Sequence, residues 1–260
     1  MFVFLLNVHI FVWYTYISGM LFLPGVFIVY NQCLIGEIRI KNINGMNKKI
    51  TLQEAVSKIK DGMTIMIGGF LACGGPLRIM EALSKTGVKN LTLIANDTAF
   101  PDKSLGLLVV NGMVSKVITS HVGTNPVTGE KMNSGEIEVE FVPQGTLAER
   151  IRAKGAGLGG VLTQTGLGTI IENGKQTVEV DGKKYLLEKP LGADLAIIGA
   201  SVADQEGNLV YNGTTQNFNP IMAMAADMVI VEAEKVVKTG DIQPEHVHTP
   251  AIFVDYIYTE

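Results

Sequence analysis

The chain has 260 residues and a formal net charge of −4 at pH 7, and its composition is 47% hydrophobic and 18% charged. This length and apolar content allow one large domain or two small ones with a full core, and the lack of a basic stripe argues against nucleic acid as a partner. The two cysteines, Cys33 and Cys73, form no disulfide framework, which indicates a protein of a reducing compartment, the cytoplasm.

The amino-terminal segment has a composition of its own. Residues 1–36 contain no Asp, Glu, Lys or Arg and carry half of the chain's aromatic residues, and the composition changes at Glu37. We interpret residues 1–45 as an apolar extension read from a wrongly assigned start, and we place the domain proper over residues 46–260. Two alternatives stay open, a soluble extension and a membrane segment, since the uncharged run exceeds the ~20 residues that span a bilayer. A membrane contact is expected only if residues 1–36 are truly translated.

The first elements of the domain lead into a glycine-rich loop. A capping box that starts at Thr51 predicts a helix beginning at Leu52. The apolar run Thr64–Ile67 predicts a buried strand, and Pro76, after four glycines, predicts the start of a helix over 77–85. Glycines let a ligand approach the backbone, and free N–H groups at a helix start favour negative charge, so this loop is predicted to cradle part of a ligand. The alternative is a tight strand-to-helix turn without a ligand.

Strands and helices alternate along most of the remaining chain. The expected strands are Leu91–Ala95, Lys116–Ser120, Glu138–Val142, Leu195–Gly199, Met228–Val231 and Ile252–Ile257, and the expected helices span 104–111, Leu147–Ala153 and 219–226. Near-continuous apolar strands between helices imply a parallel sheet that is covered on both faces.

Between residues 160 and 190 the pattern changes. Asp181-Gly182 separates two strand-like runs, Thr177–Val180 and Lys183–Leu187, and this pair of residues is a strong hairpin signal. The expected fold class is therefore α/β, with an open, mostly parallel sheet covered by helices on both faces and an inserted antiparallel hairpin flap.

A series of short motifs runs through the domain in a fixed order and spacing. They are Asp61–Pro76, Leu91–Thr98, Gly123–Pro126, Val142–Leu147, Gly155–Gly160, Thr165–Thr169 and Asn217–Pro220. Together they resemble the α (A) subunit of family I coenzyme A transferases, and the pattern is closest to the A subunit of acetate, acetoacetate or butyrate CoA-transferases. One departure is Ala251, which follows Pro250 where the family usually has Pro-Gly.

The resemblance implies one half of a two-component enzyme. Such an enzyme moves CoA between an acyl-CoA and a short-chain carboxylic acid by a ping-pong mechanism, with a nucleophilic glutamate on the partner B subunit and an α2β2 assembly. CoA would enter as a substrate, and no cofactor is implied. Glu172 lies in a Glu-Asn-Gly run similar to the nucleophile's motif, but Ile171 precedes it where that motif has Ser. We therefore expect no catalytic residue on this chain and interpret Glu172 as a turn residue at the mouth of the hairpin.

The same resemblance assigns the CoA-binding segment. The residues that would line it are Gly68, Gly69, Phe70, Leu71, Ala72, Cys73 and Gly74. Asn96 and Gln144 follow predicted strand ends, where open α/β sheets bind ligands, and their amides suit an oxyanion or a substrate carboxylate. The alternative for each is a turn-stabilising side chain.

Other candidates have plainer interpretations. Cys73 is expected to fill space in the loop rather than act as a nucleophile, since no His or carboxylate lies near it in sequence. Arg150 and Arg152 either meet CoA phosphates or form a solvated helix face. The scattered histidines show no metal-ligand spacing, so no metal is expected. A non-catalytic small-molecule sensor on a related α/β fold is the alternative function, although no helix-turn-helix pattern accompanies it here.

Overall fold

The computed structural model of the chain describes residues 3–5, 8–10 and 48–260. The chain divides into a unit of Met1–Arg39 and a unit of Ile40–Glu260. In the first, β1 (Val3–Leu5) and β2 (Val8–Ile10) pair in antiparallel fashion. Most of the extension predicted over residues 1–45 lies outside the described residues, so its interpretation stays a prediction. Within the described part, no helix has the length and apolar character needed to cross a membrane.

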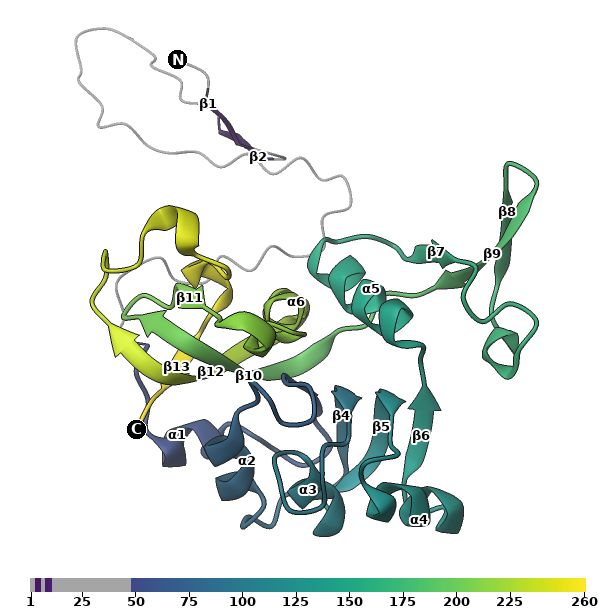
Figure 1. Cartoon of the computed structure of the whole chain (residues 1–260), viewed down its shortest axis with the longest axis horizontal. Helices are drawn as coiled ribbons and strands as arrows, with labels where there is room; N and C mark the ends of the chain where they lie inside the picture. The colour runs from purple at the N-terminus through teal and green to yellow at the C-terminus, as the bar shows by residue number, and fades with distance from the viewer. Residues whose placement is uncertain (1–2, 6–7, 11–47) are drawn as a thin grey trace, which may run out of the picture. The chain divides into compact units, whose positions relative to one another are not determined.

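A parallel sheet forms the centre of the second unit (Figure 1). Its strands are, in sheet order, β13 (Tyr256–Tyr258), β12 (Ala226–Val237), β10 (Ala193–Asp204), β3 (Thr64–Ile67), β4 (Leu91–Asp97), β5 (Val114–His121) and β6 (Glu138–Phe141). Every pairing along this path is parallel, and the short strand β11 (Leu209–Val210) adds an antiparallel pairing to β10. The predicted open, mostly parallel sheet is confirmed.

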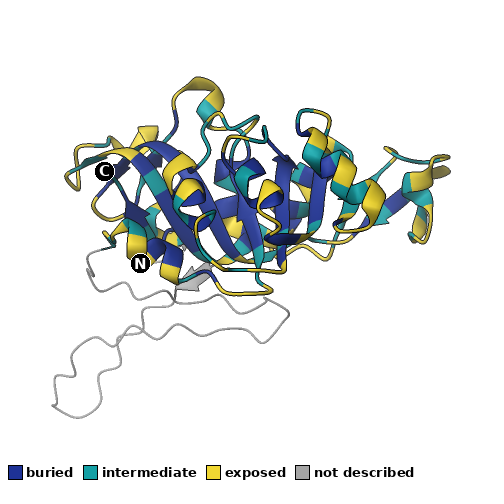
Figure 2. Cartoon of the chain, turned by 90° about the horizontal axis from the view of Figure 1, so that it is seen from below, coloured by how far each residue is buried: buried dark blue, intermediate teal, exposed yellow. Residues whose placement is uncertain are grey.

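Helices cover both faces of the sheet, as predicted. They are α1 (Leu52–Ser57), α2 (Leu77–Leu83), α3 (Gly106–Val110), α4 (Pro126–Ser134), α5 (Gln144–Gly155) and α6 (Asn219–Ala225). Successive side chains of a strand point to opposite faces, so Ile65 and Ile67 pack into the core cluster shared with α1, α2 and α3, while Met66 packs into the cluster shared with α5 and α6. Figure 2 shows the result, with buried strands between helices whose outer surfaces are exposed.

The segment between 160 and 190 forms the predicted flap. Strands β7 (Val161–Thr163), β9 (Lys183–Glu188) and β8 (Thr177–Val180) make a separate antiparallel sheet in that order. Asp181 and Gly182 have φ values of 50° and 71°, which is the backbone that a two-residue type I′ hairpin requires. The sequence had not indicated the third strand, β7.

Three other elements differ from the sequence-based predictions. α4 was not anticipated, although Pro126 at its first turn is a helix-start signal. α5 begins at Gln144 and not at Leu147, so Gln144 is the first residue of a helix. The expected strand Ile252–Ile257 is divided into a short 3₁₀ helix, η4 (Ala251–Phe253), and β13, because the Phe253 N–H turns back to the Pro250 carbonyl at 3.1 Å.

Candidate functional site

The predicted site residues gather at one edge of the main sheet. The glycine loop follows β3, Asn96 lies at the end of β4, and Gln144 comes three residues after β6. The strands run parallel and in register, with Asp97 opposite His121 and Thr119 opposite Phe141. Their carboxyl ends therefore meet at the same edge, which is where open α/β sheets bind ligands.

The glycine loop folds tightly back on itself. The N–H of Phe70 donates to the Cys73 carbonyl at 3.0 Å, and the N–H of Cys73 donates to the Phe70 carbonyl at 2.9 Å. Between them, Leu71 and Ala72 have φ values of 48° and 71°, a left-handed backbone that residues with a side chain rarely adopt. Such strain persists only where the surroundings hold it in place, and it is enriched at ligand sites.

Neighbouring elements supply that restraint. The Asn217 side chain accepts from the Gly69 N–H at 3.1 Å and donates to the Cys73 carbonyl at 3.1 Å. The Asn219 amide donates to the Gly74 carbonyl at 2.9 Å, and the Leu71 N–H donates to the Asp97 carboxylate at 2.9 Å. The loop is thus fixed by polar side chains at and just before the start of α6 and at the end of β4.

Only part of the predicted backbone cradle is available to a ligand. Among the described residues, the N–H groups of Ala72 and Gly74 have no hydrogen-bond partner, whereas the other N–H groups between Gly68 and Gly75 are used within the chain. Phe70 remains 44% exposed beside them. The loop therefore offers two backbone donors and an exposed aromatic ring, and its assignment to CoA stays a prediction.

The N–H groups at the start of α2 are not free, and this part of the expectation is wrong. The carboxylate of Glu232, on β12, accepts from the Arg78 N–H at 3.1 Å and from the Ile79 N–H at 2.9 Å. The Leu77 N–H donates to the Gly75 carbonyl, and Pro76 has no N–H to offer. Burial raises the pKa of Glu232, and its backbone hydrogen bonds act in the opposite direction.

The two amide candidates lie together at this edge of the sheet. Gln144 Nε2 donates to Asn96 Oδ1 at 2.6 Å. Asn96 is only 2% exposed, and its Nδ2 donates to Asp97 Oδ2 at 2.7 Å, so its polar atoms are engaged within the chain. Gln144 is exposed, and its Oε1 has no partner among the described residues. Gln144 is therefore the member of the pair that can meet a substrate, and Asn96 holds it.

Sequence reasoning missed two neighbours of this pair. Asp97 binds both Asn96 and the glycine loop, and the Ser120 hydroxyl donates to the Asn96 carbonyl at 2.7 Å. The signal was available, because Asp97 directly follows Asn96 and Ser120 ends the neighbouring predicted strand. What the sequence did not reveal is which of these polar residues bind each other.

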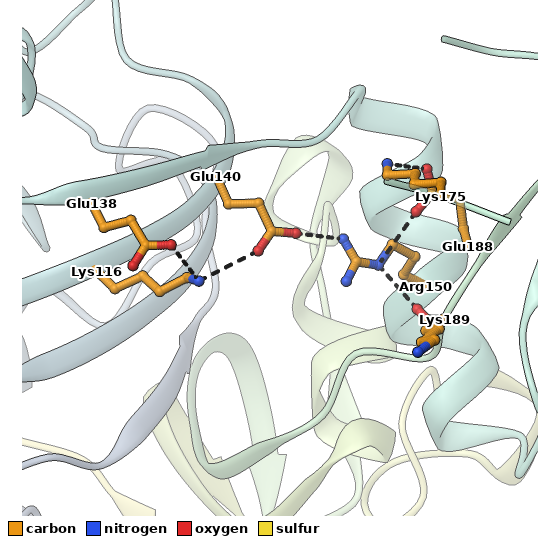
Figure 3. A network of polar contacts seen from close by, with 7 residues as sticks. All are labelled: Lys116, Glu138, Glu140, Arg150, Lys175, Glu188 and Lys189. Carbon is orange, nitrogen blue, oxygen red and sulfur yellow. Dashed lines mark hydrogen bonds and ion pairs between the residues drawn. The ribbon is translucent and has the colours of Figure 1, made fainter. Parts of the chain in front are cut away.

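Arg150 fits neither of its two interpretations. Its guanidinium is mostly buried, donates to Glu140 Oε1 at 2.9 Å and to the Lys189 carbonyl at 3.0 Å, and lies 3.9 Å from Glu188 Oε2. Figure 3 shows that this network joins α5 to the end of β9, where Glu188 also pairs with Lys175. Arg150 thus links the flap to the main sheet.

The remaining candidates have structural surroundings. Arg152 pairs with Glu149 on the exposed face of α5. Glu172, in the flap, accepts from Lys184 Nζ at 2.6 Å and from the Gly168 N–H at 2.7 Å, and the bond from Lys184 is the main cause of its lowered pKa. Cys73 is an exposed free thiol whose sulfur lies 3.6 Å from the Thr214 hydroxyl. Glu172 ends a short 3₁₀ helix, η1 (Ile170–Glu172), and its expected lack of a catalytic role stays a prediction.

Comparison with known proteins gives this geometry a family context. The family model described as coenzyme A transferase matches residues 49–260. The chain is 57% identical over 210 residues to the acetate CoA-transferase subunit alpha of Escherichia coli K12, which covers 81% of this chain and 96% of that one. It is 54% identical over 216 residues to the acetoacetyl-CoA:acetate/butyrate CoA transferase alpha subunit of Clostridium acetobutylicum, covering 83% and 99% of the two chains.

A solved structure shows a similar fold. An acyl-CoA transferase of Escherichia coli O157:H7, crystallised as a thioester complex with CoA, superposes with a TM-score of 0.76 at 24% sequence identity. The match covers 85% of this chain and 48% of that one, so this chain spans about half the length of that protein. At this identity the likeness shows the fold alone, and it agrees with the predicted fold class.

Proposed function

We propose a function from one premise: this chain belongs to the coenzyme A transferase family. It is the A subunit of a two-component enzyme that moves CoA between an acyl-CoA and a short-chain carboxylic acid, namely acetate, acetoacetate or butyrate. The observation that carries the proposal is the chain's identity with two α subunits over nearly their whole length. The names of those relatives favour an enzyme over the alternative of a non-catalytic sensor.

The proposed reaction proceeds by acyl exchange on a glutamate of the B subunit. The glutamate attacks the acyl-CoA carbonyl, which gives an acyl-glutamyl anhydride and CoA thiolate. The thiolate then attacks the glutamyl carbonyl, so the acyl group leaves as a carboxylate and a glutamyl-CoA thioester remains. An incoming carboxylate reverses these steps and departs as the new acyl-CoA. A carboxylate is a weak nucleophile, so positioning and oxyanion stabilisation must supply the rate.

The A subunit contributes donors to this site. The amide of Gln144 is exposed at the carboxyl edge of the sheet and is held by Asn96 at 2.6 Å, which suits it to stabilise an oxyanion or a substrate carboxylate. The N–H groups of Ala72 and Gly74 lie in the loop assigned to CoA. No resident cofactor takes part, since CoA is itself the substrate, and the exposed free Cys73 suits a cytoplasmic enzyme.

The test is to assay the chain with and without its partner. Acetyl-CoA formation from acetoacetyl-CoA and acetate is measured with this chain alone, with its B subunit, and with a B subunit whose Ser-Glu-Asn-Gly glutamate is changed to Gln. We expect turnover only in the second mixture, from an α2β2 assembly that light scattering would detect. Full turnover by this chain alone contradicts the proposal. So does the absence of turnover with the intact partner when acetate, acetoacetate and butyrate have each been tried as the acceptor acid.

A further inference from the structure

Asp97 joins the glycine loop to the amide pair. It lies at the end of β4, is 3% exposed, and uses both carboxylate oxygens as acceptors. Oδ1 accepts from the Ala99 N–H at 2.7 Å. Oδ2 accepts from the Leu71 N–H at 2.9 Å and from Asn96 Nδ2 at 2.7 Å. One buried side chain therefore touches both halves of the candidate site.

The chemistry of a carboxylate fixes the direction of the amides. A carboxylate only accepts hydrogen bonds, so Asn96 must turn its NH₂ group toward Asp97 and its Oδ1 toward Gln144. Asn96 Oδ1 is an acceptor, so Gln144 must turn its NH₂ group inward to donate to it. The orientation of the exposed Gln144 amide is thus set by Asp97, through the side chain of Asn96 that lies between them.

We propose that Asp97 is a positioning residue for the transferase reaction, one that sets through Asn96 the orientation of the Gln144 amide and holds it in register with Leu71 of the glycine loop. This inference rests on the function proposed for Gln144. The link to Leu71 matters because this residue has a left-handed backbone and is followed by the free Ala72 N–H. The same carboxylate therefore positions two sets of donors, the amide of Gln144 and the backbone of the loop.

The change Asp97→Asn removes the directionality with almost no change in shape. An NH₂ group in place of Oδ2 would face the donors of Leu71 and Asn96, and one in place of Oδ1 would face the Ala99 N–H. The Asn96 clash is relieved only if Asn96 rotates, and the rotation points its NH₂ group at the NH₂ group of Gln144. In the first arrangement the Gln144 amide loses its single orientation. The second keeps the acceptor for Asn96 but turns an NH₂ group against the Ala99 N–H, which displaces the side chain from Leu71 and Asn96.

Asp204 provides the matched control. It is 2% exposed at the end of β10, and its Oδ1 accepts from the N–H groups of Glu206, Gly207 and Asn208 in a comparable turn. With the partner subunit present, we expect Asp97→Asn to lower kcat at least about tenfold, because misplacing a catalytic donor by an ångström has effects of this size. Asp204→Asn is expected to keep kcat while losing comparable thermal stability.

A double-mutant cycle separates positioning from general damage. Gln144→Ala should lower kcat, and adding Asp97→Asn to it should lower kcat by a smaller factor than Asp97→Asn does alone, since the two changes share the Gln144 donor and only the bond from Leu71 is lost in addition. Full multiplication of the two effects overturns the proposal, and so does a kcat for Asp97→Asn within about twofold of the wild type. If Gln144→Ala itself has no effect, the proposed role of Gln144 fails instead.

Asn96→Ser is the second variant, for use if Asp97→Asn does not assemble with the partner. It removes the amide between Asp97 and Gln144 and leaves the bonds from Asp97 to the Leu71 and Ala99 backbone in place. We expect the same loss of kcat as for Gln144→Ala, at least about tenfold. A wild-type kcat in assembled Asn96→Ser protein overturns the proposal.

Discussion

The carboxylate of Glu232 caps helix α2 by accepting the N–H of Ile79 at 2.9 Å. Glu232 belongs to β12, far along the chain, and it also accepts from the Arg78 N–H. The helix that follows the glycine loop is therefore held by a strand of the sheet. This contact makes α2 part of the scaffold of the site.

Removing this cap should destabilise the protein. Glu232→Ala leaves the N–H groups of Arg78 and Ile79 without their acceptor, and we expect a loss of about 1–3 kcal/mol in the free energy of unfolding. Urea unfolding measures it, with Glu234→Ala, an exposed glutamate on the same strand, as the control. Equal stabilities of the two variants would show that the cap contributes nothing measurable.

Glu232 also predicts a pH dependence of stability. Burial raises its pKa above the ordinary value of 4.5 in the folded protein, so the folded state binds this proton more tightly than the unfolded state. The corresponding stability is complete below the unfolded pKa and is lost as the pH rises through the folded pKa. From pH 4.5 upward, the wild type should therefore lose free energy of unfolding relative to Glu232→Gln, which cannot titrate. Urea unfolding at a series of pH values measures the difference, and a constant difference contradicts it.

The sequence predicted the fold well where local signals and packing agree. The capping box at Thr51 closes as expected, with Thr51 Oγ1 accepting from the Glu54 N–H at 3.2 Å. The apolar strands give a parallel sheet, and Asp181-Gly182 gives the hairpin of the flap. The missed element β7 is three residues long and is only partly buried, so it carries little apolar pattern of its own.

The sequence predicted where the candidate residues lie, but not which of them form hydrogen bonds with each other. Strand ends located Asn96 and Gln144, and the structure joins them at 2.6 Å. The hydrogen bonds from the α2 N–H groups to Glu232 were not predictable, because Ile79 and Glu232 are 153 residues apart in the sequence. Arg150 is a similar case, since only the packed flap explains why this arginine is mostly buried. Long-range polar pairs depend on the assembled fold, and local periodicity does not encode them.

The apolar extension over residues 1–45 is expected to be dispensable for folding and activity. We expect a chain that begins at Met46 to fold, assemble with the B subunit and turn over as well as the full chain, because the family model matches only from residue 49. Activity assays on the two forms measure this. Mass spectrometry of the native protein is the direct test, and peptides from residues 1–36 in the membrane fraction would contradict the interpretation as a wrongly assigned start.

The link between the flap and α5 can be tested with two neighbouring arginines. Arg150→Ala removes a mostly buried cation and leaves Glu188, 2% exposed, with Lys175 as its one ion-pair partner among the described residues, so we expect a loss of about 3 kcal/mol in the free energy of unfolding (Figure 3). Arg152→Ala, on the same helix, breaks an exposed pair with Glu149 and should cost less than about 1 kcal/mol. Urea unfolding compares them, and similar small losses would show that the network does not hold the flap.

The assignment of the glycine loop to CoA can be tested with two glycines that both have a positive φ. Gly69 has a φ of 123°, and an added Cβ would lie 3.2 Å from the Gly75 Cα, whereas Gly62 has a φ of 76° with open space around it. Both Gly69→Val and Gly62→Val impose a β-branched side chain on a backbone that resists it, so both should lose stability, Gly69→Val more because of its neighbour.

Only Gly69→Val should also affect the substrate. The Cβ at this position closes on the loop that presents the Ala72 and Gly74 N–H groups, so we expect the KM for acyl-CoA to rise at least about tenfold, or about 1.4 kcal/mol of binding. Gly62→Val, which lies in a turn before β3, should keep the wild-type KM. The measurement is steady-state kinetics on enzyme that is shown by light scattering to be assembled with its partner. If assembled Gly69→Val has an unchanged KM, the loop is a strained turn and CoA binds elsewhere.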